Sequence, residues 1–100
     1  MDTPGGIVMN MNIQLIDART PEEFAQGHVS GATNIDVTSG DFVQRVQQLD
    51  KNRAYGVYCQ SGRRSSTAAD YMKALGFADV TDLSTANKAA STLCRKLVVG

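Results

Sequence analysis

Alternation of short strand patterns with helix patterns predicts an α/β fold with a mostly parallel central sheet. Residues 13–17 are apolar with little alternation, as expected for a strand buried on both faces. Residues 55–59 give a second such strand, followed by a polar, glycine-containing stretch and then a helical pattern. We therefore expect a three-layer sandwich, in which helices flank both faces of the sheet.

The composition is that of one soluble domain. The chain has 100 residues, 42% of them apolar, and its formal net charge is zero. Zero net charge argues against broad electrostatic binding of nucleic acid. No apolar run approaches the ~20 residues that span a bilayer, and the N-terminus lacks the pattern of a secretory signal. We expect a cytoplasmic protein without a membrane partner, with residues 1–12 as a flexible lead-in or short strand and residues 13–100 as the domain.

The first half of the domain carries clear helix signals. Thr20, Pro21 and Glu23 predict a helix start with a capping box, and Gly27 predicts its end. A short strand is expected at residues 31–36. An amphipathic helix is then expected at residues 41–49, with an apolar side made of Phe42, Val46 and Leu49.

The second half continues the alternation. A strand is expected to end at Cys59, and Ser65, Ser66 and Thr67 are candidate N-caps for a helix that runs to Leu75. Residues 78–83 predict the last strand. Thr85 is expected to cap a last helix over residues 86–97, whose packing side is formed by Ala89, Ala90, Leu93 and Leu97.

The chemistry concentrates at Cys59, which lies at the carboxyl end of a predicted strand, where ligands bind in parallel sheets. The loop that follows offers free backbone N–H groups and the positive end of a helix dipole. Arg63 and Arg64 add fixed positive charge. This setting stabilises a thiolate, so Cys59 is predicted to be a nucleophile rather than a buried apolar residue.

Three blocks of this sequence resemble the single-domain rhodanese family of thiosulfate sulfurtransferases. The first block is Leu15–Phe24, the second is Gly27–Ile35, and the third is the active-site stretch Tyr58–Ser65 with Ala68-Ala69 and Leu75-Gly76-Phe77 behind it. The resemblance covers residues 13–83. The chain departs from the family after Leu83, where it has Ser84-Thr85-Ala86-Asn87 in place of the usual Gly-Gly pair.

The resemblance implies a rhodanese-like fold and sulfur transfer through a persulfide on Cys59, without a metal or organic cofactor. It implies a small anionic sulfur donor, and cyanide, a thiol or a sulfur-accepting protein as acceptor. The implied substrate-binding residues are those of the loop and the helix start: Gln60, Ser61, Gly62, Arg63, Arg64 and Ser65.

Other polar residues near this site have structural interpretations. His28 lies in the second block, which is structural in the family, and Asp17 with Arg19 is expected to form an ion pair or hydrogen-bond network. Glu23 is explained by helix capping, and Cys94 by packing in the core.

The sequence also allows two alternatives: a non-catalytic rhodanese-type module that binds a protein partner, and a rhodanese-related phosphatase. A cysteine-dependent phosphatase needs five residues between its cysteine and arginine, so that the loop surrounds a phosphoryl group. Only four residues separate Cys59 from Arg64. The shorter loop favours a sulfur atom over a phosphoryl group.

Overall fold

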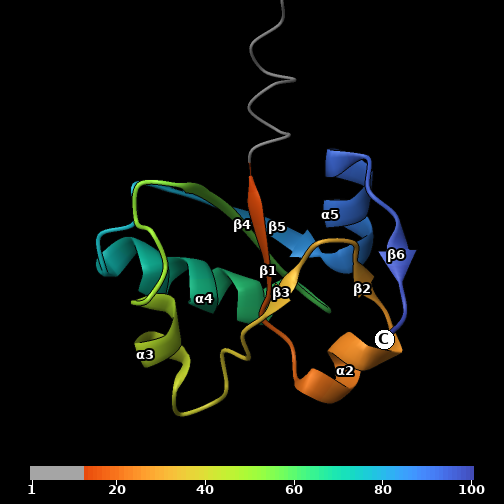
Figure 1. The fold of residues 1–100 in the computed structure, drawn as a ribbon, viewed down its shortest axis with the longest axis horizontal. Coiled ribbons are helices and arrows are strands. Elements are labelled where there is room, and N and C mark those ends of the chain that lie inside the picture. Colours follow the sequence, from red (N-terminus) through yellow and green to blue (C-terminus); the bar gives the residue numbers. More distant parts are fainter. Residues whose placement is uncertain (1–12) are drawn as a thin grey trace, which may run out of the picture.

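The computed structural model describes residues 13–100, so the predicted lead-in at residues 1–12 lies outside the described part. A parallel four-stranded sheet with the order β3-β1-β4-β5 forms its centre. Its strands are β1 (Gln14–Asp17), β3 (Thr33–Asn34), β4 (Ala54–Cys59) and β5 (Asp79–Thr85). Helices α3 (Phe42–Val46) and α4 (Arg63–Ala74) lie on one side of the sheet, and α5 (Ala86–Leu93) lies on the other (Figure 1).

Neighbouring residues of the central strands face opposite layers, because side chains alternate along a strand. Ile16 and Val57 pack with apolar side chains of α3 and α4. Their neighbours Leu15 and Tyr58 pack in a second cluster with Ala89 and other residues of α5. Both faces of the sheet are therefore buried, which confirms the predicted three-layer sandwich.

Helix α2 (Pro21–Gln26) begins as predicted. The Thr20 side chain accepts a hydrogen bond from the Glu23 N–H, and the Glu23 carboxylate accepts one from the Thr20 N–H, which completes the capping box. Gly27 follows as the C-cap. The helix lies at the carboxyl end of β1 (Figure 1), so its capping residues are next to the predicted site.

Two elements are shorter than predicted. Strand β3 covers two residues of the range 31–36, because the chain turns at Asp36, whose carboxylate accepts a hydrogen bond from the Thr38 N–H at 2.8 Å. Helix α3 ends at Val46 instead of Leu49. Leu49 nevertheless packs against the cluster that contains Phe42, so its predicted place on the apolar side is confirmed.

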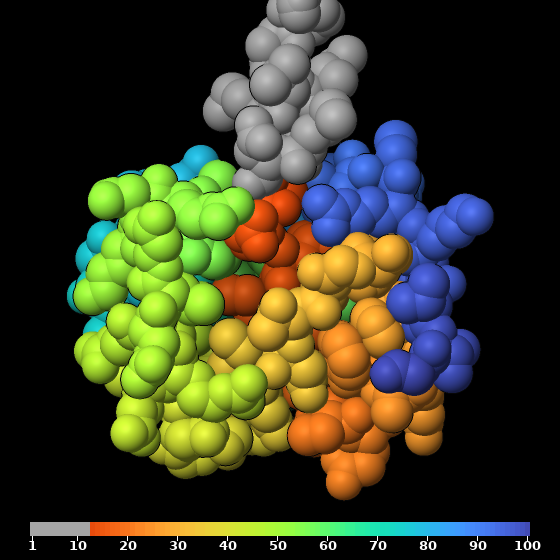
Figure 2. All heavy atoms as spheres, viewed as in Figure 1, coloured from red at the N-terminus to blue at the C-terminus, as the bar shows by residue number. Residues whose placement is uncertain are grey.

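The last predicted helix is wrong beyond Leu93. Cys94 adopts φ 55° in the left-handed region and ends α5. Residues Leu97–Val98 then form β6, which pairs antiparallel with β2 (His28–Val29). Figure 2 shows this C-terminal stretch lying against the early part of the chain. Leu97 is consequently 50% exposed instead of packed inward.

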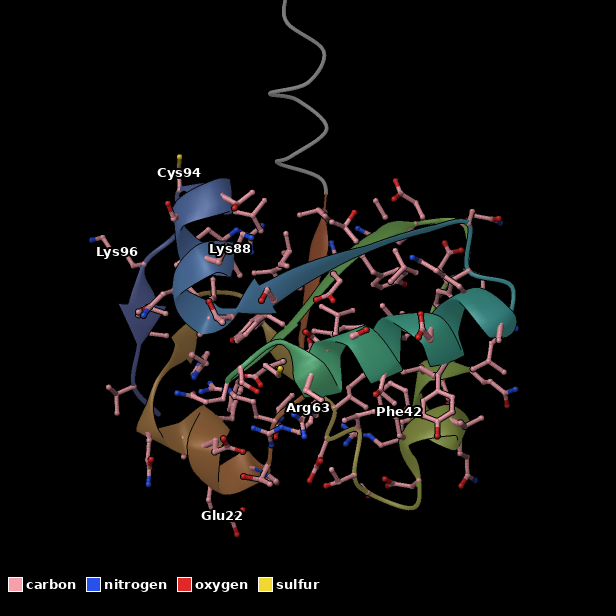
Figure 3. All side chains as sticks on the ribbon, turned by 180° about the vertical axis from the view of Figure 1, so that it is seen from behind. Glu22, Phe42, Arg63, Lys88, Cys94 and Lys96 are labelled. Carbon is pink, nitrogen blue, oxygen red and sulfur yellow. The ribbon has the colours of Figure 1, made fainter. Side chains whose placement is uncertain are left out.

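Cys94 is exposed, so its predicted packing in the core is wrong. Figure 3 shows it at the far end of α5, pointing away from the body of the protein. None of the helices within residues 13–100 is both long enough and apolar enough to cross a membrane.

Candidate active site

The helix behind the cysteine loop begins earlier than predicted. Helix α4 starts at Arg63, and its N-cap is Gly62, which adopts φ 94° and makes no side-chain cap. The predicted N-caps Ser65, Ser66 and Thr67 therefore lie inside the helix, with Ser65 in its first turn. A left-handed N-cap favours glycine, because a β-carbon would clash with the backbone. The loop between β4 and α4 is thus only three residues long.

Cys59 ends β4 and is 0% exposed, so its thiol lies beneath the loop. The Gly62 N–H donates a hydrogen bond to the Cys59 Sγ at 3.0 Å. Burial acts to raise the pKa of the thiol, but hydrogen bonds from the Ser65 hydroxyl and from the Ser65, Gly62 and Ser61 N–H groups outweigh it, and the pKa is lowered. The sulfur occupies the place that a capping oxygen takes at other helix starts.

The Ser65 side chain is fully buried beside the sulfur. Its Oγ lies 3.6 Å from the Cys59 Sγ, 2.7 Å from the Asp82 Oδ1 and 3.1 Å from the Gly62 carbonyl oxygen. It also lies 3.3 Å from the Ser84 carbonyl oxygen. Asp82 and Ser84 therefore belong to the surroundings of the cysteine; the sequence pointed to Ser84, in the stretch that departs from the family, but not to Asp82.

A β-bulge in β5 brings these two residues to the site. The register with β4 shifts between Val57 and Tyr58, which pair with Asp82 and Ser84 respectively. Ser84 takes φ 72°, a left-handed conformation that is rare outside glycine. Its Oγ lies 2.7 Å from the position that a β-carbon on Gly62 would occupy. A side chain at Gly62 would therefore have to adopt a left-handed conformation and displace the Ser84 hydroxyl.

Arg64 is held by α2. Its Nη1 and Nη2 atoms donate to the two carboxylate oxygens of Glu23 at 2.7 and 2.9 Å. The hydrogen bond from Arg64 lowers the pKa of Glu23 to about 2. Capping therefore explains only part of the role of Glu23, which also ties α2 to the cysteine loop. Arg63 is exposed at the start of α4 (Figure 3).

Asp17 and Arg19 form the predicted ion pair beneath the loop. The Arg19 Nη2 donates to the Asp17 Oδ2 at 2.7 Å and to the Gly27 carbonyl oxygen at 2.6 Å. Its Nη1 lies 3.4 Å from the Gln60 Oε1. The pair is buried, and it positions the residue that follows the cysteine.

His28 has the scaffold role that the sequence predicts. Its Nδ1 lies 2.9 Å from the Phe24 carbonyl oxygen, and its ring stacks on the Phe24 ring with a centroid distance of 3.7 Å. Within residues 13–100, no three His, Cys, Asp or Glu side chains are placed to hold a metal ion.

Two open hollows flank the loop, with volumes of about 210 and 260 Å³, and Arg19, Gly27 and Gln60 line both. The first also contacts the start of α5 and Leu97, and the second contacts Glu23. A larger hollow of about 460 Å³ lies along α3 and touches none of the predicted site residues.

Comparison with known proteins identifies the family. The family model of the rhodanese-like domain matches residues 7–89. The chain belongs to this family. Thiosulfate sulfurtransferase GlpE of Pseudomonas aeruginosa is 39% identical over 71 residues, which are 70% of this chain and 62% of that protein. Thiosulfate sulfurtransferase PspE of Escherichia coli is 37% identical over 67 residues, 65% of this chain and 62% of that protein.

A solved structure described as a rhodanese with anions from E. coli is 31% identical, with a TM-score of 0.71. The match covers 87% of this chain and 98% of that one. The rhodanese fold is thus shown both by sequence and by structure. The chain spans less than two thirds of the length of the two curated relatives.

Proposed function

We propose that the protein is a sulfurtransferase that moves sulfane sulfur through a persulfide on Cys59. The observation that carries this proposal is a buried thiol at a helix start that has no capping side chain, with the Gly62 N–H 3.0 Å from its sulfur. The relatives named thiosulfate sulfurtransferases support the same reaction. We place the protein in a reducing compartment such as the cytoplasm, where a free thiol persists.

The proposed reaction has two displacement steps. In the first step, the Cys59 thiolate attacks the outer sulfur of thiosulfate or a related donor. A bond forms between the Cys59 Sγ and that sulfur, the S–S bond of thiosulfate breaks, and sulfite leaves with the electron pair. In the second step, cyanide, a thiol or a sulfur-accepting protein attacks the outer sulfur of the persulfide, and Cys59 leaves as a thiolate.

Backbone N–H groups of the loop support both steps, because they stabilise negative charge on the sulfur at the start and at the end of the cycle. We propose that Gln60, Ser61, Gly62 and Ser65 cradle the sulfur through these groups, while Arg63 and Arg64 attract the anionic donor. Arg64 would serve this purpose from a fixed position, since Glu23 holds its guanidinium.

The test is formation of thiocyanate from thiosulfate and cyanide. We expect activity in the wild type and in Cys94→Ser, because Cys94 is exposed and distant in sequence from the loop. We expect no activity in Cys59→Ser. A folded wild type without activity would favour the non-catalytic binding module, and full activity in Cys59→Ser would refute the mechanism.

A further inference from the structure

The Ser65 hydroxyl has one proton and four neighbours that can accept it. These are the Asp82 carboxylate at 2.7 Å, the Gly62 and Ser84 carbonyl oxygens at 3.1 and 3.3 Å, and the Cys59 sulfur at 3.6 Å. A hydroxyl donates only one hydrogen bond, and a charged acceptor at short distance is the strongest of the four. While Cys59 is a thiol, the proton of Ser65 therefore points at Asp82.

This orientation matters for the sulfur. When Ser65 donates to Asp82, its oxygen faces the Cys59 Sγ with a lone pair and accepts the S–H. That arrangement suits the thiol, whereas a thiolate requires a donor. Ionisation of Cys59 thus requires the hydroxyl proton to lie on the side of the sulfur.

We propose that Asp82 is a positioning residue that sets the balance between thiol and thiolate at Cys59 through the Ser65 hydroxyl. The thiol proton passes to the Ser65 Oγ as the original Ser65 proton passes to the Asp82 Oδ1. The S–H bond and the first O–H bond break, and two new O–H bonds form. Asp82 then gives its proton to water, which leaves a thiolate that faces the Ser65 O–H.

The burial of the three residues fits such a path. Cys59 and Ser65 are both 0% exposed, whereas Asp82 is exposed to solvent. The Ser84 N–H donates to the Asp82 Oδ1 at 2.9 Å and keeps the carboxylate aimed at Ser65. The chain therefore links a buried sulfur to water through one hydroxyl and one carboxylate.

Among the other charged groups around the loop, four side chains form two ion pairs and Arg63 is exposed. Arg64 is paired with Glu23, with Asp36 as a further nearby acid. The Arg19–Asp17 pair lies below the loop. Within residues 13–100, none of these side chains makes a hydrogen bond to the Cys59 Sγ or the Ser65 Oγ.

The proton balance of Cys59 does not depend on sulfur transfer, but its use in turnover rests on the proposed function. In the second step, Cys59 leaves as a thiolate, and a hydroxyl that faces the sulfur stabilises this leaving group. While Cys59 is a persulfide, the Ser65 hydroxyl donates its hydrogen bond to Asp82.

The experiment titrates Cys59 by the ultraviolet absorbance of its thiolate in the Cys94→Ser background, with Cys59→Ser/Cys94→Ser as the blank. Asp82→Asn should lower the midpoint by about one pH unit, because the amide holds the Ser65 proton less strongly and carries no charge. Asp79→Asn is the matched control. Asp79 is exposed at the opposite end of the same strand, so Asp79→Asn should not move the Cys59 midpoint.

Two further measurements separate a hydrogen-bonded relay from a distant charge. In a Ser65→Ala background, the shift caused by Asp82→Asn should fall to less than half. In the protein that retains Ser65, the shift of the Cys59 midpoint caused by Asp82→Asn should persist at about 1 M salt, which screens interactions between exposed charges. An unchanged midpoint in Asp82→Asn would overturn the proposal. Equal shifts with and without Ser65, or loss of the shift in salt, would overturn it as well.

The titration needs no sulfur donor, so its failure is distinguishable from failure of the proposed function. A normal midpoint shift in a protein that forms no thiocyanate would leave the relay intact and refute sulfur transfer. A protein that forms thiocyanate but shows no midpoint shift in Asp82→Asn would refute the relay and leave the sulfur-transfer proposal intact.

Discussion

Two adjacent strand ends lead into helices that begin in opposite ways. Cys59 on β4 and Thr85 on β5 are register partners, and α4 and α5 follow them. Thr85 caps its helix, since its Oγ1 accepts a hydrogen bond from the Lys88 N–H at 3.1 Å. At α4 the N-cap is Gly62, which has no capping side chain, and the N–H of Ser65, the counterpart of Lys88, hydrogen-bonds the cysteine sulfur instead, together with the Gly62 N–H.

We propose that the difference separates a structural helix start from one that serves a reactive thiol. A side-chain oxygen in the cap position uses the free N–H groups for stability. A glycine in that position leaves them available to a negative charge on the neighbouring sulfur. The same backbone feature thus stabilises the fold at α5 and lowers the pKa of the thiol at α4.

The largest effect is expected from Gly62→Ala. An alanine would have to adopt φ 94°, and its β-carbon would lie 2.7 Å from the Ser84 Oγ. Left-handed strain and crowding together should cost about 3 kcal/mol of the free energy of unfolding, measured by urea denaturation. The midpoint of Cys59 alkylation should also rise, because the N–H geometry is disturbed. Gly76→Ala is the matched control, since Gly76 also has positive φ but a β-carbon added there would meet nothing within 4 Å.

Arg64→Ala should reduce kcat/KM for thiosulfate about ten- to a hundredfold, as expected for loss of a charge-assisted contact. The change also leaves Glu23 without its partner, so thermal unfolding must be measured in parallel. Arg63→Ala, whose side chain is exposed, is the comparison variant. Equal activity of Arg64→Ala and wild type would make Arg64 a structural residue only.

Thr85→Ala tests the other helix start. Loss of the cap should lower the free energy of unfolding by about 1 kcal/mol, with no change in the alkylation midpoint of Cys59. The two starts would not be independent if this variant shifted that midpoint as strongly as Gly62→Ala does.

The smallest effect is expected from the Glu23–Arg64 pair in acid. The pKa of Glu23 is about 2 in the folded protein against an ordinary value of 4.5. The stabilisation is therefore complete above pH 4.5 and is lost as the pH falls toward 2. Because the pair is partly exposed, it should amount to about 1 kcal/mol or less.

The measurement is the unfolding free energy of Glu23→Gln and wild type over this pH range. The difference between them should shrink in acid. Glutamine retains the capping geometry, and Glu22→Gln is the control that lacks the ion pair. A constant difference at all pH values would show that the pair does not stabilise the fold.

Local signals in the sequence predicted the fold well where one short pattern decides the structure. The capping box at Thr20 and the buried strands at Leu15 and Val57 are examples. The sequence did not predict strand β6, because Leu93 and Leu97 have helical spacing. Leu97 belongs to a strand only because it pairs with β2.

The candidate site was predicted in part for the same reason. Cys59 and its loop lie in one continuous stretch, so their proximity follows from the sequence. Asp82 and Ser84 reach Ser65 through a bulge in another strand, and Glu23 reaches Arg64 from another helix. Such contacts depend on register and packing, and no local pattern encodes them.

The most direct test of the central claim is the intact mass of the protein after incubation with thiosulfate. We predict a gain equal to one sulfur atom on Cys59, which a reducing thiol removes and which Cys59→Ser never acquires. Cys94→Ser should gain the same mass as wild type. An unmodified mass of folded wild-type protein, or a sulfur adduct located on Cys94, would contradict the account.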